Sequence, residues 1–279
     1  MAAKDTLARR VVAFLDNEDD PAAIANPVHS TEIARQLGFA GPLVGGVTVW
    51  GWAVPAIIDA LGESWLDRGW ASFRFRQPVY PGDALRIELA PEGSDAWTLR
   101  MANESGVDCV VGAVGLGEGP ALADFVGPRR LTPEVSPVPR PELRVAIDPA
   151  LVGLDWAPMA VSAEPEAMRD YVLQSHRSAD PRFAGDRPRL HPAWLVARAE
   201  ALMRHNFAIP SSIHTRSEVE FLAPAWAGGE VVVGGRCVTL YERKGRPFVE
   251  FDCLVRGRDG TDLARMRHTT IFDAMAGLE

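Results

Sequence analysis

A short pattern of hydrophobic residues followed by a proline, a glycine and an acidic residue occurs twice in this 279-residue chain. The two copies are about 146 residues apart. The first copy spans Phe73–Asp83 (FRFRQPVYPGD) and the second spans Val219–Glu230 (VEFLAPAWAGGE). The same offset carries the Gly45-Gly46 pair onto His191-Pro192. Two landmarks at one constant offset indicate that the chain contains a duplicated domain, and each half can therefore be compared with the other.

The composition is that of an ordinary globular protein, with 47% hydrophobic and 24% charged residues. The length allows two modest domains, each with its own core. A net charge of −8 argues against non-specific binding to nucleic acid, which requires a basic surface. The longest apolar stretch, residues 47–61, is too short to span a bilayer, and the N-terminus has no uninterrupted apolar core. We therefore expect a cytoplasmic protein that binds neither nucleic acid nor membrane.

The cysteine and histidine residues do not form a metal-binding pattern. Cys109, Cys237 and Cys253 have no CxxC spacing and lie in apolar, strand-like contexts, which predicts buried free thiols. The histidines do not have metal-ligand spacing either. We expect no metal and no cofactor.

The hydrophobic periodicity predicts an apolar helix in the first half, followed by strands. The helix spans residues 46–63, and Pro55 must kink or break it. Residues 5–16 also have helical spacing. The predicted strands, which are separated by Gly-containing turns, are 70–79, 84–91, 96–102 and 107–115.

The second half repeats this order. Residues 164–174 are predicted to be helical, and residues 191–206 form an amphipathic helix with Pro192 in its first turn, where a missing N–H costs nothing. The predicted strands are 214–223, 230–241, 246–256 and 263–273.

A Pro-rich stretch lies between the two halves, from residue 117 to about residue 144, and its composition is typical of an extended linker. We therefore expect an N-terminal domain at 1–117, a linker at 118–145 and a C-terminal domain at 146–279. The expected fold class is α+β, with a central helix wrapped by an antiparallel sheet in each domain.

Three segments resemble the MaoC-like family of hot-dog-fold hydratases and dehydratases, which includes R-specific enoyl-CoA hydratases. They are Asn26-Pro27-Val28-His29, the GFAGPLVGG run at 38–46, and the RQPVYPGD strand and turn at 76–83. The resemblance covers roughly residues 20–115 well, and 160–273 weakly but in the same order. It implies a double hot dog, that is, two tandem hot-dog domains.

The resemblance also implies a lyase activity of fatty acid or polyketide metabolism in bacteria. Members of the family add water to, or remove it from, the C2–C3 bond of an acyl thioester carried by coenzyme A or an acyl-carrier protein. The family uses a histidine and an aspartate as general acid and base, and a backbone N–H at the start of the central helix stabilises the developing enolate.

The family residues carry over only in part. His29 matches the catalytic histidine, Asn26 and Pro27 match the turn that presents it, and Gly46 matches the N–H donor. The family aspartate falls on Ile24, which cannot exchange a proton. The helix-start histidine is replaced as well, because Gly45 stands at its position. The resemblance therefore implies catalytic roles for His29, Gly46 and Asn26. It implies substrate-binding roles for Gly45, Pro27 and His191. Trp50, on the predicted apolar helix, is a further candidate for substrate binding as an aromatic wall.

The second copy is more degenerate. Asp180-Pro181 echoes the Asn-Pro turn, and Phe183 stands where the histidine should be. His191 restores the helix-start histidine, although a structural N-cap is its more ordinary role, and Pro192 has no N–H to donate. We expect the pocket that contains His29 and Gly46 to be the working one, with the second half as lid, wall and acyl tunnel.

Three functions stay open at this point. The first is an acyl-thioester hydratase or dehydratase, in which Asp19, Asp20, Asp180 or Arg177 replaces the missing aspartate. The second is a non-catalytic thioester-binding protein or a partner subunit of a catalytic hot-dog protein; a homodimer is equally open. The third is a thioesterase, which needs a carboxylate on a central helix; Asp59, Glu63 and Glu200 are the available ones.

Overall fold

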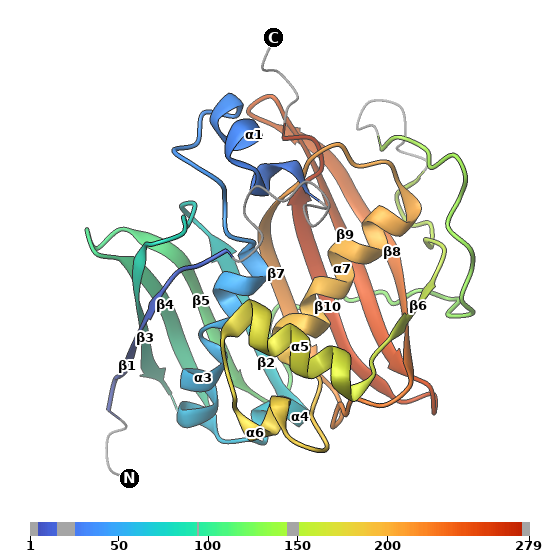
Figure 1. Ribbon diagram of the computed structural model, residues 1–279. Helices are drawn as coiled ribbons and strands as arrows, with labels where there is room; N and C mark the ends of the chain where they lie inside the picture. Colours follow the sequence, from blue (N-terminus) through green and yellow to red (C-terminus); the bar gives the residue numbers. More distant parts are fainter. Residues whose placement is uncertain (1–4, 16–25, 94, 144–150, 275–279) are drawn as a thin grey trace.

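A single ten-stranded antiparallel sheet organises the molecule (Figure 1). The computed structural model describes residues 5–15, 26–93, 95–143 and 151–274. The strand order is β1-β3-β4-β5-β2-β7-β10-β9-β8-β6, so each half of the chain supplies five neighbouring strands. The first half supplies β1 (Leu7–Val12), β2 (Gly69–Phe75), β3 (Ala84–Glu92), β4 (Ala96–Asn103) and β5 (Asp108–Leu116). The second supplies β6 (Met159–Ser162), β7 (Ile213–Phe221), β8 (Glu230–Arg243), β9 (Arg246–Gly257) and β10 (Asp262–Ile271).

The helices pack mainly on one face of this sheet (Figure 1). The long helix α7 (Pro192–Asn206) and the shorter α2 (Gly46–Gly51) and α3 (Val54–Leu61) form its central layer. The remaining helices are η1 (Pro27–His29), α1 (Thr31–Gln36), α4 (Trp65–Arg68), α5 (Pro165–His176) and α6 (Pro181–Ala184). The predicted α+β class, with helices wrapped by antiparallel strands, is confirmed.

The two halves are joined through the pairing of β2 with β7, at the centre of the sheet. In this antiparallel pair Ser72 lies opposite Glu218, which is 146 positions later in the chain. Equivalent residues therefore meet where the two halves join. The other landmark agrees, because Gly45 is the N-cap of α2 and His191 is the N-cap of α7. The structure thus shows the internal repeat that the sequence indicated.

The helix expected at residues 5–16 is wrong, because Leu7–Val12 is strand β1, at the edge of the sheet. Leu7 pairs with Leu89 and Val11 with Leu85 of β3. Leu7 and Val11 are four residues apart, a spacing that suits one face of a helix and also one face of a strand. The segment forms a strand and not a helix because the N–H and C=O groups at the edge of β3 require hydrogen-bond partners.

The apolar helix predicted at 46–63 is broken into α2 and α3, as Pro55 required. Pro55 lies in the first turn of α3, where no intrahelical acceptor needs its missing N–H. At the end of α2, Gly51 allows a close approach of α7 and α5. A Cβ on Gly51 would lie 2.8 Å from the Cβ of Ala193 and 2.3 Å from Cε1 of His176. The packing of the central helices therefore depends on this glycine.

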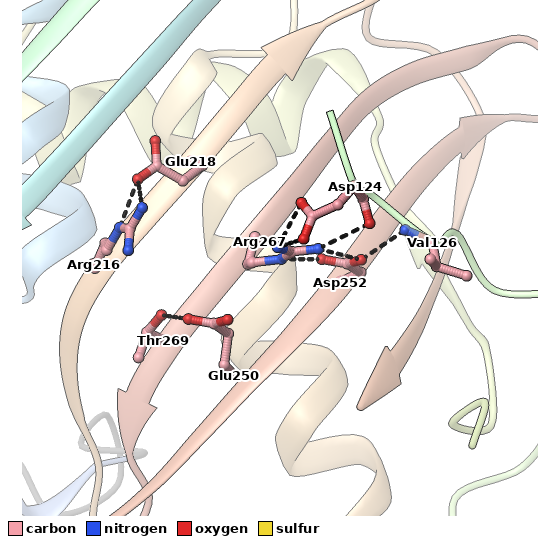
Figure 2. Close-up of polar contacts among 8 residues, drawn as sticks. All are labelled: Asp124, Val126, Arg216, Glu218, Glu250, Asp252, Arg267 and Thr269. Atoms are coloured by element: carbon pink, nitrogen blue, oxygen red, sulfur yellow. Dashed lines mark hydrogen bonds and ion pairs between the residues drawn. The ribbon is translucent and has the colours of Figure 1, made fainter. Parts of the chain in front are cut away.

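The Pro-rich linker segment, residues 117–143, contains neither a helix nor a named strand. The expected domain limits stay predictions, and the end of the linker at 144–150 lies outside the described residues. The linker is fixed to the sheet by Asp252, whose side chain is completely buried (Figure 2). Asp252 accepts bonds from Nε of Arg267 (2.7 Å) and from the backbone N–H of Val126 (2.8 Å). Arg267 also donates to Asp124 of the linker (2.9 Å).

The three cysteines are buried free thiols, as predicted. Burial raises the pKa of the Cys237 thiol to about 11, so it is not an ionised nucleophile at neutral pH.

Replacing Arg267 with Met is expected to lower the free energy of unfolding by about 3–5 kcal/mol, because it leaves the Asp252 carboxylate buried without its partner. Urea unfolding followed by circular dichroism measures this change. The control is Asp124→Asn, which removes an exposed partner of the same arginine and should lower the free energy by less than about 1 kcal/mol. Equal losses in the two variants would contradict the assignment of Asp252 as the anchor of the linker.

Candidate functional site

A cavity of about 560 Å³ lies between the two halves of the chain. The first half lines it with the turn at 26–29, the start of α2 and the segment that follows β2. The second half lines it with α7, the start of β7 and one residue of β10. Most of the lining is apolar, which suits an acyl chain, and a small number of polar groups converge on it.

His29 lies in the wall of this cavity with one ring nitrogen already bonded. Its Nδ1 lies 2.6 Å from the backbone oxygen of Leu43. A carbonyl can only accept, so Nδ1 carries the hydrogen and the neutral ring leaves Nε2 as a free acceptor. Burial lowers the pKa of His29, which favours this neutral form at neutral pH. The side chain is therefore prepared to take up a proton at Nε2.

The turn at 26–29 holds His29 in place through bonds at both ends. The N–H of His29 donates to the backbone oxygen of Asn26 (3.1 Å), and the N–H of Leu43 donates to the oxygen of Val28 (3.1 Å). The Asn26 side chain makes two hydrogen bonds to Ser212 of the second half. Its Nδ2 donates to the backbone oxygen of Ser212 (2.8 Å), and its Oδ1 accepts from the N–H of Ser212 (3.2 Å). Both ends of the Asn26 side chain are thus engaged with Ser212, and Pro27 begins the 3₁₀ turn.

The start of α2 lies directly beside the His29 ring. A Cβ on Gly45 would lie 3.7 Å from Cε1 and 3.9 Å from Nε2 of His29. Gly46, the first residue of α2, is covered by the ring of Phe75, which a Cβ would approach to 2.8 Å. The first N–H groups of a helix have no acceptor within the helix. Backbone donors and the free Nε2 of His29 therefore occur together in the cavity wall.

Glu200, which the sequence predicts only as a carboxylate for a thioesterase, also lines the cavity. Its Oε1 accepts bonds from Oγ of Ser212 (2.5 Å) and Nε of Arg204 (2.8 Å). Glu200 is close enough to His29 for its negative charge to raise the pKa of the imidazole, whereas the positive charge of Arg204 lowers it. The signal that could have found Glu200 is the repeat itself, because it places α7 against α2 of the other half.

Of the four candidate substrate-binding residues, only Gly45 lines the cavity; Pro27, Trp50 and His191 do not. Trp50 is completely buried in the core, where its ring stacks on Phe73 at 4.5 Å. His191 caps α7 by accepting from the N–H of Ala193 (3.2 Å), and its ring stacks on His176 at 4.3 Å. Both side chains are held by packing and capping away from the cavity.

The other described candidates to replace the family aspartate, and the other carboxylates considered for a thioesterase, are engaged elsewhere. Asp180 pairs with Arg182, and the Arg177 guanidinium lies 3.8 Å from the centroid of the Phe14 ring. Asp59 pairs with Arg9, and Glu63 lies 3.8 Å from Arg182. None of them lines the cavity. Asp19, Asp20 and Ile24 lie outside the described residues.

In the second half, the space beside the helix N-cap His191, which corresponds to the cavity beside Gly45, is filled by side chains. The buried Phe183 ring packs 4.6 Å from the His191 ring, just as the His29 ring lies beside Gly45. Tyr171 and His176 complete the cluster. The two copies thus differ in kind, because an open cavity lies beside the first helix start and an aromatic cluster surrounds the second.

Removing the charge of Glu200 with Gln is expected to lower the pKa of His29 further, and removing the charge of Arg204 with Gln is expected to raise it. Titration of the ¹⁵N-labelled histidines by NMR measures both shifts, with the His29 signals assigned by their loss in His29→Gln. A His29 pKa that is unchanged in both variants would show that this pair does not act on the imidazole.

Within the described residues, no helix is long and apolar enough to cross a membrane, and no three His, Cys, Asp or Glu side chains are grouped so that they could hold a metal ion.

Comparison with known proteins agrees with this geometry. Residues 25–111 match the family model of the MaoC like domain. No curated protein matches the chain significantly by sequence. A solved structure named as a MaoC-like dehydratase is 16% identical, with 89% of this chain and 90% of that chain covered and a TM-score of 0.57.

Two further solved structures cover nearly the whole chain. One is a protein from Chloroflexus aurantiacus J-10-fl described as a putative MaoC domain protein dehydratase; it is 13% identical over 98% of this chain and 96% of that chain, with a TM-score of 0.61. The other is a conserved hypothetical protein from Mycobacterium tuberculosis described as a double hotdog fold; it is 16% identical over 97% and 96%, with a TM-score of 0.57. This chain has the double hot-dog fold, and its residues 25–111 match the MaoC like domain.

Proposed function

We propose that this protein adds water to, or removes it from, the C2–C3 bond of an acyl thioester bound in the cavity between its two halves. The observation that carries the proposal is the neutral His29, whose free Nε2 lies beside the start of α2 in an apolar cavity. Those are the parts that this reaction needs: a proton acceptor, backbone donors for an enolate, and room for an acyl chain.

His29 is the acid–base residue. In the hydration direction Nε2 takes a proton from water as the oxygen forms its bond to C3. The same proton, or its equivalent, passes from the imidazolium to C2, and His29 returns to the neutral form. One water O–H bond and the C2–C3 π bond are broken, and one C3–O and one C2–H bond are formed, so the step balances without another reactant. The burial that lowers the pKa of His29 keeps Nε2 free at neutral pH.

The N–H of Gly46 is the proposed donor to the thioester oxygen while negative charge develops there. The N-cap Gly45 leaves room for the substrate beside Nε2, since even a methyl group there would contact the His29 ring. Asn26 positions His29 and does not itself react, because both ends of its side chain are bonded to Ser212.

Glu200 takes the place of the missing family aspartate. Its negative charge favours the imidazolium that forms on His29 during the reaction, and its Oε1 is already held by Ser212 and Arg204. The active site is then composed from both halves, with the histidine from the first and the carboxylate from the second.

A thioesterase is the second candidate function, since Glu200 also supplies a carboxylate on a central helix that lines the cavity. Hydrolysis of the thioester releases a free thiol, whereas hydration does not. The non-catalytic binding function is less favoured, because the cavity beside His29 is not filled by side chains.

The natural substrate in this proposal is an acyl group on coenzyme A or on a carrier protein, in the cytoplasm. Whether the chain acts as a homodimer or with a catalytic hot-dog partner belongs to the same proposal. Light scattering of the purified protein, alone and with such a partner, addresses that part.

Wild-type protein is expected to remove the ultraviolet absorbance of trans-2-enoyl-CoA substrates of short or medium chain length. His29→Ala should reduce the rate by about 10²–10⁴, the usual contribution of a general acid–base group. His205→Ala is the matched control, because His205 binds the backbone oxygen of Glu134 and does not line the cavity. Equal rates in the His29 and His205 variants would rule out His29 as the acid–base residue.

Glu200→Gln separates the two candidate reactions. We expect it to reduce enoyl-CoA hydration by roughly 10²-fold, with no release of free thiol by either wild type or variant. Free thiol is measured with a chromogenic disulfide. A wild type that releases thiol, and a variant that does not, would replace the hydratase proposal with the thioesterase.

A further inference from the structure

Two histidines in the cavity, one half-buried and one completely buried, take no part in the proposed reaction. His214 of β7 and His268 of β10 both line the cavity, and their rings stack with centroids 4.0 Å apart. The Phe75 ring lies 4.8 Å from the His214 ring and also covers Gly46. The histidine pair is therefore separated from the start of α2 by one aromatic ring.

A β-bulge brings His214 onto this face of the sheet. Positions 214 and 217 would point to opposite faces of a regular strand, because their separation is odd. Between β7 and β10, however, His214 pairs with Thr270 and Arg216 pairs with Thr269, so Thr215 is an extra residue. The bulge reverses the alternation, and His214 and Ser217 then share the inner face with His268.

The hydrogen-bond chain through Ser217 fixes where the protons lie. Nε2 of His214 lies 3.1 Å from the backbone oxygen of Arg216, which can only accept, so Nε2 carries the hydrogen. It also lies 2.8 Å from Oγ of Ser217 and donates to it. The Ser217 hydroxyl then donates to Nδ1 of His268 (3.0 Å), which leaves the hydrogen of His268 on Nε2.

Each ring is left with one nitrogen that has no partner. Nδ1 of His214, an acceptor, and the N–H at Nε2 of His268, a donor, are buried without a hydrogen bond among the described residues. Burial lowers the pKa of His214 to about 3 and that of His268 well below its ordinary value, so both rings are neutral and their roles are fixed. Buried polar groups normally have partners. An unused donor and an unused acceptor on stacked rings match a ligand group that both donates and accepts.

We propose that the His214–His268 pair binds a hydroxyl group on the acyl chain of the substrate, at a carbon beyond C3. The hydroxyl donates to Nδ1 of His214 and accepts from Nε2 of His268. A keto group would use only the donor, and an alkyl chain would use neither. This inference rests on the proposed function, since it assumes that the cavity holds an acyl thioester.

The test measures binding, not turnover, so that it does not depend on catalysis. Saturated acyl-CoA thioesters of several lengths, which cannot be hydrated, are compared by calorimetry with matched chains carrying one hydroxyl at successive carbons beyond C3. The wild type is expected to bind one hydroxylated chain about tenfold more tightly than the alkyl chain of the same length, because a site built to bond a hydroxyl rejects an analogue that lacks it.

His268→Phe should abolish this preference and keep the binding of the alkyl chain, because phenyl replaces the donor with apolar surface. His205→Phe, outside the cavity, should retain the preference. If His268→Phe does not fold, the ¹⁵N signals of the wild type decide: the Nε2 resonance of His268 should shift on binding the hydroxylated chain and not on binding the alkyl chain.

The two proposals fail in different ways. If alkyl and hydroxylated chains bind equally at every length, or the preference survives in His268→Phe, the hydroxyl site is overturned and water alone occupies the pair, while the proposed function stands. If no acyl-CoA binds at all, the proposed function and the hydroxyl site are both overturned.

Discussion

The antiparallel pairing of β2 with β7 is the contact on which the rest of the structure depends. It joins two five-stranded halves into one sheet and sets Ser72 opposite its repeat equivalent Glu218. With the sheet continuous, the central helices of both halves share one layer, and Gly51 allows α2 and α7 to approach closely. The end of α2 contacts the start of α7 at Gly51 and Ala193, and the start of α2 and the later turns of α7 line the cavity. A cavity that includes groups from both halves follows from that arrangement.

The two copies have diverged so that each half now contributes something different. The first copy has His29 beside the Gly45-Gly46 helix start and an open cavity. In the second copy the same place is packed with the rings of Phe183 and His191, and the proline after the cap has no N–H to donate. The second half instead provides the wall of the first site, through α7, β7 and β10. This division explains how the chain can lack the family aspartate at position 24 and still place a carboxylate, Glu200, near His29.

Much of the fold could be predicted from the sequence, and less of the site. The repeat, the Pro55 break and the helix starting at Pro192 depend on local chemistry, so periodicity and proline positions were sufficient. The strand at Leu7–Val12 could not be predicted, because the free edge of β3 decides its conformation. His29 and Gly46 follow from the family resemblance, whereas Glu200 and the His214–His268 pair depend on strand pairing, helix contact and a bulge. Trp50 and His191 were implied as binding residues, but they face the core and the helix cap.

The central claim is that His29 moves a proton between water and C2 while the oxygen of water adds to C3. The most direct measurement is the reaction of a trans-2-enoyl-CoA in D₂O, with the product analysed by proton NMR. The account predicts a 3-hydroxyacyl-CoA with one deuterium at C2 on the same face as the new hydroxyl, formed about 10²–10⁴ times more slowly with His29→Ala. Deuterium on the opposite face, or recovery of free coenzyme A with the acyl chain unchanged, would contradict it.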